Sequence, residues 1–440
     1  MTELPVAAWM FPVLFVLVFA GYPVAFSLIG VSLVFGYGIF GASLGPQLLG
    51  RIMDISSNLT LAAIPLFVFM GAMLQGSGVA KRLFEATRVW LGRLPGGLSV
   101  SSIVMCAIFA ATSGIIGAVE IVVGLMALPA MEAAKYKRDL SSGTICAGGA
   151  LGTIIPPSIV VVIYASIAEM SVGDLFAGVL IPGVTMVLLF LVYIVLRCWI
   201  QPSAAPPLSA AELDVPLAGK LWLAATALLP CLALVAAVLG SIFAGIASPT
   251  EAAAVGALGS VLLTAAYGDF SFDTLIGALR RTVVITSMVM LIIAGGVMFS
   301  SIFIVGGGNA LVLDIVDTFE LGPTGMFILF LGIIFVLGFV LDWISIVLVT
   351  IPIFDPLIQQ AGIDSIWFGV MVCVTLQTSY LTPPMAPSIF FLRSIAPKDF
   401  TYSDMYLGVS PFVLMQLATL LVVILLPWTA TYLPNVLFRL

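Results

Sequence analysis

The chain has 440 residues, of which 62% are hydrophobic and 8% are charged, and its formal net charge is −6. A soluble core of this size does not need so much apolar surface, and runs of about twenty apolar residues recur along the whole length, so the sequence predicts a polytopic membrane protein. Lipid offers no partner to an unpaired backbone group, and the short alternating segments of a β-barrel are missing, so we expect an all-α fold. The absence of histidine excludes histidine-based catalysis, metal ligation and proton relays.

The apolar segments are of three kinds. Those that fit a single membrane helix lie near residues 6–21, 24–41, 59–79, 172–198, 217–240, 246–268, 282–305 and 402–427. Segments 141–170 and 366–396 are longer, and each carries two adjacent prolines at its centre. Segments 97–130 and 322–357 would be roughly 50 Å long as single helices, which exceeds a hydrocarbon core of about 30 Å. We therefore expect about ten spans, two of them broken at Pro-Pro, and two re-entrant hairpins.

Each expected hairpin has a polar interruption at its middle, "ATSG" at 111–114 and "FVLDW" at 339–343. Re-entrant tips are tolerated at membrane depth only where protein or water buries them. The preceding segments, 80–95 and 307–320, have the amphipathic pattern of helices that lie at a membrane interface. Each of these is either a simple connector or a brace that holds its hairpin against a scaffold, and the sequence leaves both possibilities open.

The chain repeats its own pattern at an offset of about 227 residues. "GYPVAFSLIG" (21–30) recurs as "ASPTEAAAVG" (247–256), and the double proline at 156–157 recurs at 383–384. The sequence therefore predicts two repeats built on one plan, joined by a polar linker. The first repeat covers residues 1–199, the linker 200–216 and the second repeat 217–440.

The positive charges predict how the two repeats are oriented. With both hairpins re-entrant, every Lys and Arg except Arg51 and Arg439 falls on one side of the membrane, which the positive-inside rule assigns to the cytoplasm. The first hairpin then enters from the cytoplasm and the second from outside. The repeats are therefore predicted to be inverted, with a cytoplasmic linker and both termini in the periplasm.

The double prolines indicate what the broken helices are for. A proline at position i removes the hydrogen bond to the carbonyl of residue i−4, so the prolines are expected to leave four carbonyl oxygens unpaired, those of Gly152, Thr153, Ser379 and Tyr380. A new half-helix begins at the same point, with free amides and the positive end of its dipole. One break thus offers oxygens to a cation and donors to an anion, an arrangement typical of secondary transporters with inverted repeats.

Each break is expected to face the hairpin tip of its own half, which gives two oxygen-rich cation sites with Na⁺ as the natural candidate. The predicted residues are Thr112, Ser113, Gly114, Gly152 and Thr153 in the first site and Asp342, Ser379, Tyr380 and Thr382 in the second. Exposing an intramembrane carboxylate to lipid costs about 2.5–3.5 kcal/mol, so an acid at this depth indicates a functional site. We therefore expect Asp342 to have a role in function. The alternative role of Asp342, which Ser113 could share, is to cap the return helix of its hairpin.

The predicted substrate-binding residues flank the breaks: Pro156, Pro157, Ser158, Pro383, Pro384 and Arg393. Arg393 lies roughly 13 Å beyond Pro384 along the half-helix, where it could meet a substrate carboxylate or snorkel to the cytoplasmic interface. Glu120 lies six residues beyond the first tip, where a water-lined or helix-pairing role competes with a role in transport. No cofactor other than Na⁺ as coupling ion is expected, and no transition metal or nucleic acid.

At this point the motifs resemble those of a known family. The segments "GTICAGGALGTIIPPSIVVVIYA" (143–165), "GFVLDWISIVLVTIPIFDPLI" (338–358) and "LTPPMAPSIFFLRSIAP" (381–397) resemble the large membrane subunit of tripartite ATP-independent periplasmic (TRAP) transporters. The resemblance covers nearly the whole chain. It departs from the family at Met385, because many members have "TPPVG" where this chain has "TPPMAPS".

The resemblance implies an elevator-type secondary transporter of the bacterial inner membrane, driven by Na⁺ and importing organic acids. It implies two partners, a small four-helix membrane subunit on a separate chain and a periplasmic substrate-binding protein. The two sodium sites of the family would fall on Ser113, Gly152 and Thr153 and on Asp342 and Thr382.

Three alternatives to this function remain. A stand-alone ion-coupled carboxylate transporter of the same hairpin architecture would need no binding protein, and neighbouring genes for the two partners would distinguish the two cases. An intramembrane enzyme fits less well, because the chain has no histidine, no Ser–Lys pair at matched depth and no metal motif. A channel would need a pore-lining ring of charge, which the sequence does not indicate.

Overall fold

The computed structural model describes residues 5–113, 116–207 and 215–438, and within these ranges the chain is all-α, without strands, as the sequence predicts. The helices before the linker are α1 (Ala7–Phe19), α2 (Val24–Phe40), α3 (Leu44–Ser56), α4 (Ala63–Gln75), α5 (Val79–Leu91), α6 (Gly97–Ser113), α7 (Ile116–Ala133), α8 (Arg138–Ala150), α9 (Ile159–Ile167) and α10 (Val172–Ile200), with short 3₁₀ turns η1 (Gly41–Ser43), η2 (Leu59–Ala62), η3 (Leu151–Thr153) and η4 (Pro202–Ala204).

The helices after the linker are α11 (Leu217–Phe243), α12 (Pro249–Ala266), α13 (Phe272–Val305), α14 (Gly308–Thr318), α15 (Pro323–Leu337), α16 (Trp343–Gln360), α17 (Ser365–Leu381), α18 (Pro387–Ile395), α19 (Tyr402–Leu425) and α20 (Trp428–Phe438). The segments of both expected hairpins form pairs of packed helices, α6 with α7 and α15 with α16. Both expected breaks separate shorter helices, α8 from α9 and α17 from α18. The amphipathic segments form α5 and α14.

Seven helical segments within the described ranges are long and apolar enough to cross a membrane, or eight if the pair α4–α5, bent by 66°, is counted as one span. This is fewer than the ten spans expected, and it includes α16, which belongs to the second expected hairpin and was not expected to span the membrane. The first expected span, 6–21, contains only 13 helical residues in α1, which at 1.5 Å per residue are too short to cross the bilayer unaided. The two Pro-Pro segments are likewise divided into helices below the length of a span.

Two helices were not expected from the sequence. The helix α3 is amphipathic, with the polar residues Gln47, Arg51 and Asp54 on a short segment, so it gives no membrane-span signal. The helix α20 follows Pro427 and contains Pro434. Proline disfavours a helix that continues through it, so both residues predict a break and not a new helix. Both helices were therefore missed because they are short and because their local sequences do not indicate a membrane helix.

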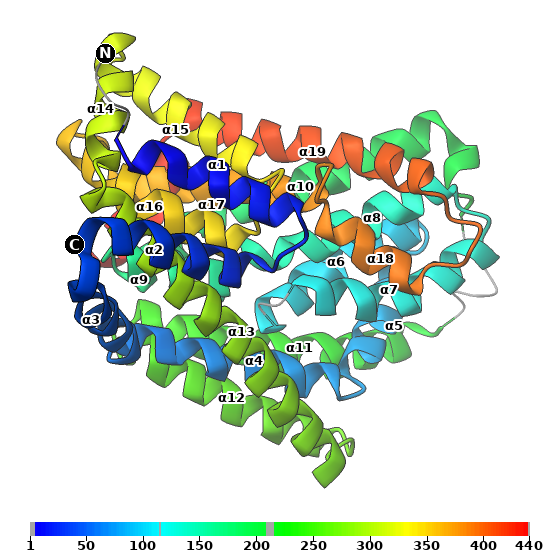
Figure 1. Ribbon diagram of the computed structural model, residues 1–440. Helices are drawn as coiled ribbons and strands as arrows, with labels where there is room; N and C mark the ends of the chain where they lie inside the picture. The colour runs from blue at the N-terminus through cyan, green and yellow to red at the C-terminus, as the bar shows by residue number, and fades with distance from the viewer. Residues whose placement is uncertain (1–4, 114–115, 208–214, 439–440) are drawn as a thin grey trace.

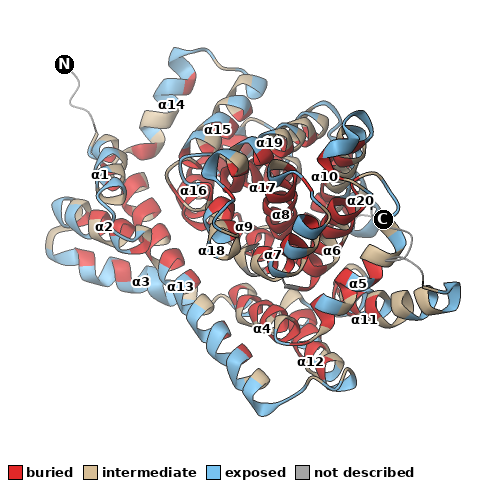
Figure 2. Cartoon of the chain, turned by 90° about the vertical axis from the view of Figure 1, so that its right-hand side faces the viewer, coloured by how far each residue is buried: buried red, intermediate tan, exposed pale blue. Residues whose placement is uncertain are grey.

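The helices form two groups. Helices α6–α10 and α15–α20 make an inner bundle in which the buried residues concentrate, and helices α1–α5 and α11–α14 lie around two adjacent sides of it as an outer group (Figures 1 and 2). Within the outer group, α12 packs on α4 and α11, and α13 packs on α2 and α4. The long helix α13 also packs on α16 of the inner bundle. The contact between α13 and α16 thus joins the two groups close to the second hairpin.

The two halves of the sequence interleave inside the inner bundle. Helix α7 packs on α18, α9 packs on α16, and α8 packs on α19. The α8–α19 contact is so close that a Cβ added at Gly143 would overlap the Gly408 carbonyl, and one added at Gly408 would overlap the Asp139 carbonyl. Small residues let membrane helices approach to this distance, so glycine is required at both positions.

Replacing Gly143 by leucine is therefore expected to destabilise the protein by about 3 kcal/mol or more, because the side chain has no space against the α19 backbone. Thermal unfolding of the detergent-solubilised variant measures this. The matched control is Gly277→Leu on α13, where an added Cβ meets nothing within 4 Å and helix propensity improves. A Gly143→Leu variant that melts with the control would contradict the close approach.

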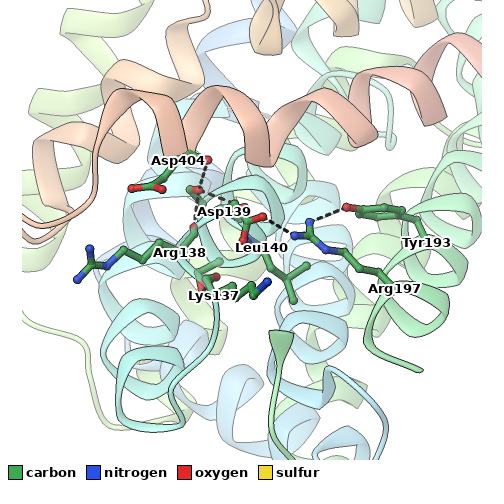
Figure 3. A network of polar contacts seen from close by, with 9 residues as sticks. Lys137, Arg138, Asp139, Leu140, Tyr193, Arg197 and Asp404 are labelled. Carbon is green, nitrogen blue, oxygen red and sulfur yellow. Dashed lines mark hydrogen bonds and ion pairs between the residues drawn. The ribbon is translucent and has the colours of Figure 1, made fainter. Parts of the chain in front are cut away.

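A polar network ties the ends of α8, α10 and α19 together (Figure 3). Asp139 of α8 accepts a hydrogen bond from Arg197 of α10, whose guanidinium also donates to the Tyr193 hydroxyl at 2.7 Å. The Ser142 hydroxyl donates to the Asp404 carbonyl at 3.3 Å, which adds α19. The network is only part-buried, so it orients these helix ends more than it stabilises them.

The amphipathic helix α5 makes specific contacts with the outer group. The Arg82 guanidinium lies 4.4 Å from the centre of the Tyr267 ring and donates to the Tyr267 carbonyl at 3.1 Å, and Trp90 donates to the Lys220 carbonyl at 3.2 Å. Its other neighbours are the hairpin helices α6 and α7. These contacts join the first hairpin to α11 and α12, which favours the brace over the simple connector.

Candidate functional site

The tip of the second hairpin is shaped by Asp342. Helix α15 ends at Leu337, and Asp342 is the N-cap of α16. One carboxylate oxygen accepts from the amides of Ile344 at 3.1 Å and Ser345 at 3.3 Å, and the other accepts from the Ser345 hydroxyl at 2.6 Å. The capping role considered from the sequence is therefore present. A carboxylate offers about four lone-pair sites, so three hydrogen bonds leave capacity for a cation.

The second break lies directly against this tip. An added Cβ at Gly338 would lie 2.6 Å from the Ser379 Cβ, so the hairpin turn and the end of α17 touch. After α17 the backbone turns at Thr382 and restarts as α18 at Pro387, with Ala386 in the left-handed region at φ 32°. Within the part of the chain that the structure describes, no hydrogen bond reaches the carbonyl oxygens of Ser379 and Tyr380. These two oxygens are free to bind a ligand.

A cavity of about 300 Å³ opens at this point, between the inner bundle and the outer group. Asp342, Ser379 and Tyr380 line it together with the start of α18, and the opposite wall is a face of α13. The wall residues of α13 are Ile285, Met288, Val289 and Ile292. The volume lies at the lower end of the range for small-molecule sites, which are typically mostly apolar with a few placed polar groups.

Four helices begin at the cavity. Gly117 of α7, Ile159 of α9, Trp343 of α16 and Pro387 of α18 all line it, and each is the first or second residue of its helix. The N-terminus of a helix carries a partial positive charge and unpaired amides, which favour anions. No Lys or Arg is among the described residues that line the cavity. Helix N-termini, and not basic side chains, are therefore the groups of this wall that favour an anion.

The first hairpin and first break meet in a different environment. Helix α6 packs on η3, and Thr112, Gly152 and Thr153 are buried. The Thr112 hydroxyl donates to the Phe109 carbonyl at 2.8 Å, inside its own helix. Gly114 lies outside the described residues, and so does the side chain of Ser113. The structure thus packs α6 against the turn that holds Gly152 and Thr153, and none of the three described members of the first set lines the cavity.

One expectation for the first break was wrong. The Thr153 carbonyl, predicted to be unpaired, accepts a hydrogen bond from the Ser158 hydroxyl at 2.6 Å, because Ser158 follows the prolines and its side chain folds back over the break. Among the described residues, no hydrogen bond reaches the Gly152 carbonyl. The Thr153 hydroxyl also donates within the chain, to the Ala150 carbonyl at 3.0 Å. The first break therefore offers fewer free oxygens than the second.

The residues predicted around the breaks differ in exposure. Pro156, Pro157 and Ser158 are buried, whereas Pro383 and Pro384 are exposed. Pro156 lines a separate apolar recess beside α6, α10 and α11, and neither Pro383 nor Pro384 lines the cavity described above. The two breaks therefore face different surroundings, although their sequences are alike.

Thr382 and Arg393 also lie off the cavity wall. The Thr382 hydroxyl donates to the Thr378 carbonyl of α17. The Arg393 guanidinium donates to the Phe400 carbonyl at 2.6 Å and lies 5.5 Å from the centre of the Tyr402 ring. Arg393 thus holds the segment between α18 and α19, and the structure does not bring it to Asp342.

Sequence reasoning missed several residues of the cavity, namely the α13 wall, Gly117, Ile159 and Phe391. The α13 residues are ordinary apolar residues of a long helix, and nothing local marks them. The position of Ile159 and Pro387 directly after the breaks was an available signal, because a half-helix must begin there.

Residues 11–429 match the family described as "Tripartite ATP-independent periplasmic transporter, DctM component". The C4-dicarboxylate TRAP transporter large permease protein DctM of Pseudomonas aeruginosa is 32% identical over 395 residues, which cover 88% of each chain. The ectoine TRAP transporter large permease protein TeaC of Halomonas elongata is 29% identical and covers 96% of this chain and 97% of its own. The sialic acid TRAP transporter large permease protein SiaM of Vibrio cholerae is 29% identical, with coverage of 95% and 96%.

A solved structure has the same fold. The crystal structure of the Alcanivorax borkumensis YdaH transporter superposes with a TM-score of 0.62 over 95% of this chain and 98% of that chain, at 13% sequence identity. At this identity the likeness concerns the fold alone.

Proposed function

The chain belongs to the DctM family, the large membrane subunits of tripartite ATP-independent periplasmic (TRAP) transporters, and is a multi-pass membrane protein. From this premise we propose that it imports an organic acid together with Na⁺ by moving its inner bundle, as an elevator, along the outer group. The observation that carries the proposal is the position of the cavity, which lies between the two groups and combines the Asp342 carboxylate with four helix N-termini. Its proposed activity is transport and not catalysis.

Asp342 is the proposed Na⁺ ligand of the cavity. Its carboxylate is half-buried, faces the cavity and retains lone-pair capacity after capping α16. The free carbonyl oxygens of Ser379 and Tyr380 lie on the neighbouring break, and hard cations prefer such oxygen ligands. A second Na⁺ site is proposed at the first break, around the Gly152 carbonyl.

The proposed substrate is an anion. The cavity offers helix N-termini on several sides, and each is suited to a carboxylate. The names of the relatives include C4-dicarboxylates and sialic acid, which agrees with this chemistry. The apolar wall on α13 would then contact the carbon skeleton of the substrate.

Two inverted repeats are part of the proposal. The helices after the linker follow those before it in the same order, so that α6 and α15 begin at Gly97 and Pro323, and α7 and α16 begin at Ile116 and Trp343. The crossed contacts α7–α18 and α9–α16 are related in the same way. Two repeats of the same plan and opposite orientation would give the carrier an outward-facing and an inward-facing state of similar energy, as alternating access requires.

The family assignment implies two partners, and we place the assembly in the bacterial inner membrane, with both termini in the periplasm. The small membrane subunit is expected on the outer group, which stays fixed in the elevator model. The periplasmic binding protein is expected to deliver the substrate from the periplasmic side.

Uptake in proteoliposomes tests the proposal. The chain is reconstituted with its small subunit, and labelled organic acids are offered with or without an inward Na⁺ gradient and with or without the purified binding protein. Uptake that needs both the gradient and the binding protein is expected. Uptake without the binding protein would instead indicate a stand-alone carrier, and Na⁺-independent uptake would contradict the proposed coupling.

A further inference from the structure

Glu120 of α7 is a fully buried acid that the proposed function does not use. Its relative exposure is 0%, and its side chain packs on α8, where an added Cβ at Gly149 would lie 2.7 Å from the Glu120 Cβ. The Cys146 thiol and the Ser388 hydroxyl are the hydrogen-bonding groups beside its carboxyl group, but within the described residues neither carboxyl oxygen has a partner at full hydrogen-bond geometry. Glu120 is also absent from the ion pairs found there. A charged carboxylate that is buried at such a position is costly unless a partner compensates its charge.

The surroundings of Glu120 are set by three helices. The Cys146 thiol of α8 and the Ser388 hydroxyl of α18 lie beside the carboxyl group, and Cys106 of α6 is within electrostatic range. The two thiols are the titratable groups that face it, and no charged side chain of the neighbouring helices pairs with it in the described part of the chain. The Ser388 hydroxyl is itself buried and, apart from Glu120, has no hydrogen-bonding neighbour within the described residues.

This environment fits a proton better than a metal ion. A hard cation such as Na⁺ prefers several oxygen ligands, and a thiol is a soft one. Ser388 lies in the first turn of α18, after Pro387, which has no N–H. The N-terminus of α18 repels a cation but can stabilise a carboxylate, whereas burial favours the neutral acid. A movement of the α18 N-terminus relative to Glu120 would therefore change the balance between the neutral and the charged acid.

Glu120 lies directly behind the wall of the substrate cavity. Gly117, one helical turn before it on α7, lines the cavity and packs against the ring of Phe391, which lines the cavity too. On α18, Pro387 lines the cavity and its neighbour Ser388 lies beside Glu120. The first turn of α18 thus contacts both the cavity and the buried acid. Substrate in the cavity and a proton on Glu120 would each act on the position of this turn. Binding at one site would therefore change the affinity of the other site, which is a thermodynamic coupling.

We propose that Glu120 is a proton-binding site that couples proton movement to transport. A proton from the periplasmic side bonds to a Glu120 carboxyl oxygen while the substrate occupies the cavity, and the same O–H bond breaks to release the proton to cytoplasmic water when α18 moves. The site adds one proton to the Na⁺-coupled cycle and involves no redox step. This inference rests on the proposed function, because the direction of the proton follows that of the substrate.

The transport test compares wild type, Glu120→Gln and Glu132→Gln in proteoliposomes. Glutamine keeps the shape of the protonated acid but cannot exchange a proton, and Glu132 is an exposed acid on the same helix. We expect the apparent substrate affinity of the wild type and of Glu132→Gln to change by about fivefold or more between acidic and alkaline pH at a fixed Na⁺ gradient. Glu120→Gln is expected to lose this dependence, together with substrate-driven proton entry reported by an internal pH dye.

A second measurement needs no transport. Infrared difference spectra of the reconstituted protein, recorded during a pH titration, should show the carbonyl band of a buried carboxylic acid that appears as the pH falls. The band should be missing in Glu120→Gln and retained in Glu132→Gln. If uptake of every organic acid fails but the band titrates, the proposed function is wrong and the proton site stands.

Two results would overturn the proton site itself. One is an unchanged pH dependence of uptake in Glu120→Gln. The other is a carboxylic acid band assigned to Glu120 that does not change over the whole pH range in which the protein is folded, which would make Glu120 a permanently neutral packing residue.

Discussion

Replacing Asp342 by alanine is expected to reduce uptake to the level measured without a Na⁺ gradient. The substitution removes the only carboxylate among the described residues that line the cavity, and with it the proposed charge partner of Na⁺. It also removes the N-cap of α16, which costs about 1 kcal/mol of stability. The measurement is Na⁺-driven uptake in proteoliposomes at matched protein content, with thermal unfolding recorded in parallel.

Two further variants separate the charge from the cap. Asp342→Asn keeps a side-chain oxygen that can accept from the Ile344 and Ser345 amides, so it should unfold close to wild type and still lose Na⁺-dependent uptake. Asp364→Asn is the matched control, because Asp364 caps α17 by accepting from the Trp367 amide at 2.8 Å and is exposed outside the cavity. Full Na⁺-driven uptake by Asp342→Asn would show that Asp342 serves only as a cap.

A disulfide between α13 and α16 is expected to stop transport, because it would tie the outer group to the inner bundle. An added Cβ at Gly296 would lie 2.5 Å from the Leu348 Cβ, and the Ser300 hydroxyl donates to the Leu348 carbonyl at 2.6 Å. A small shift of α13 brings this pair to the usual disulfide geometry. The double variant Gly296→Cys, Leu348→Cys should lose uptake on oxidation and regain it on reduction.

The control cross-link lies one residue away and stays inside the outer group. An added Cβ at Gly295 would lie 3.2 Å from the Cβ of Leu28 on α2, so Gly295→Cys with Leu28→Cys should cross-link without stopping uptake. The five native cysteines are buried and unpaired, so they should compete little for the oxidant. If the oxidised Gly296–Leu348 variant transports at the rate of the control, α13 and α16 do not slide past each other and the elevator proposal is wrong.

The main features of the fold are predictable because each has a strong local cause. Adjacent prolines cannot continue a helix, so the breaks at 156–157 and 383–384 followed from the covalent structure of the chain. The division of residues 322–357 into two helices followed from segment length, because a single helix through these residues would be too long for the bilayer. The helix α20 could not be predicted, because its prolines argue against a helix locally and its packing on α10 and α17 outweighs them.

Only one wall of the cavity was predictable from the sequence. Asp342, Ser379 and Tyr380 were expected together, because a lone intramembrane acid and a helix break each have a chemical signature. The opposite wall of the cavity comes from α13, where Ile285 and Ile292 differ in no way from lipid-facing residues. Which apolar face meets the site depends on tertiary packing, and a single sequence does not contain that information locally.

The interleaving of the two halves bears on how the protein is made. When translation reaches the linker at 200–216, helices α7, α8 and α9 have been synthesised, but α18, α19 and α16, on which they pack, have not. The backbone of Gly143 must therefore remain without its final neighbour, Gly408, until nearly the whole chain has left the ribosome. Insertion of the helices and closure of the inner bundle are thus separate events in time, and a chain cut at the linker would leave each half without the surfaces that complete it.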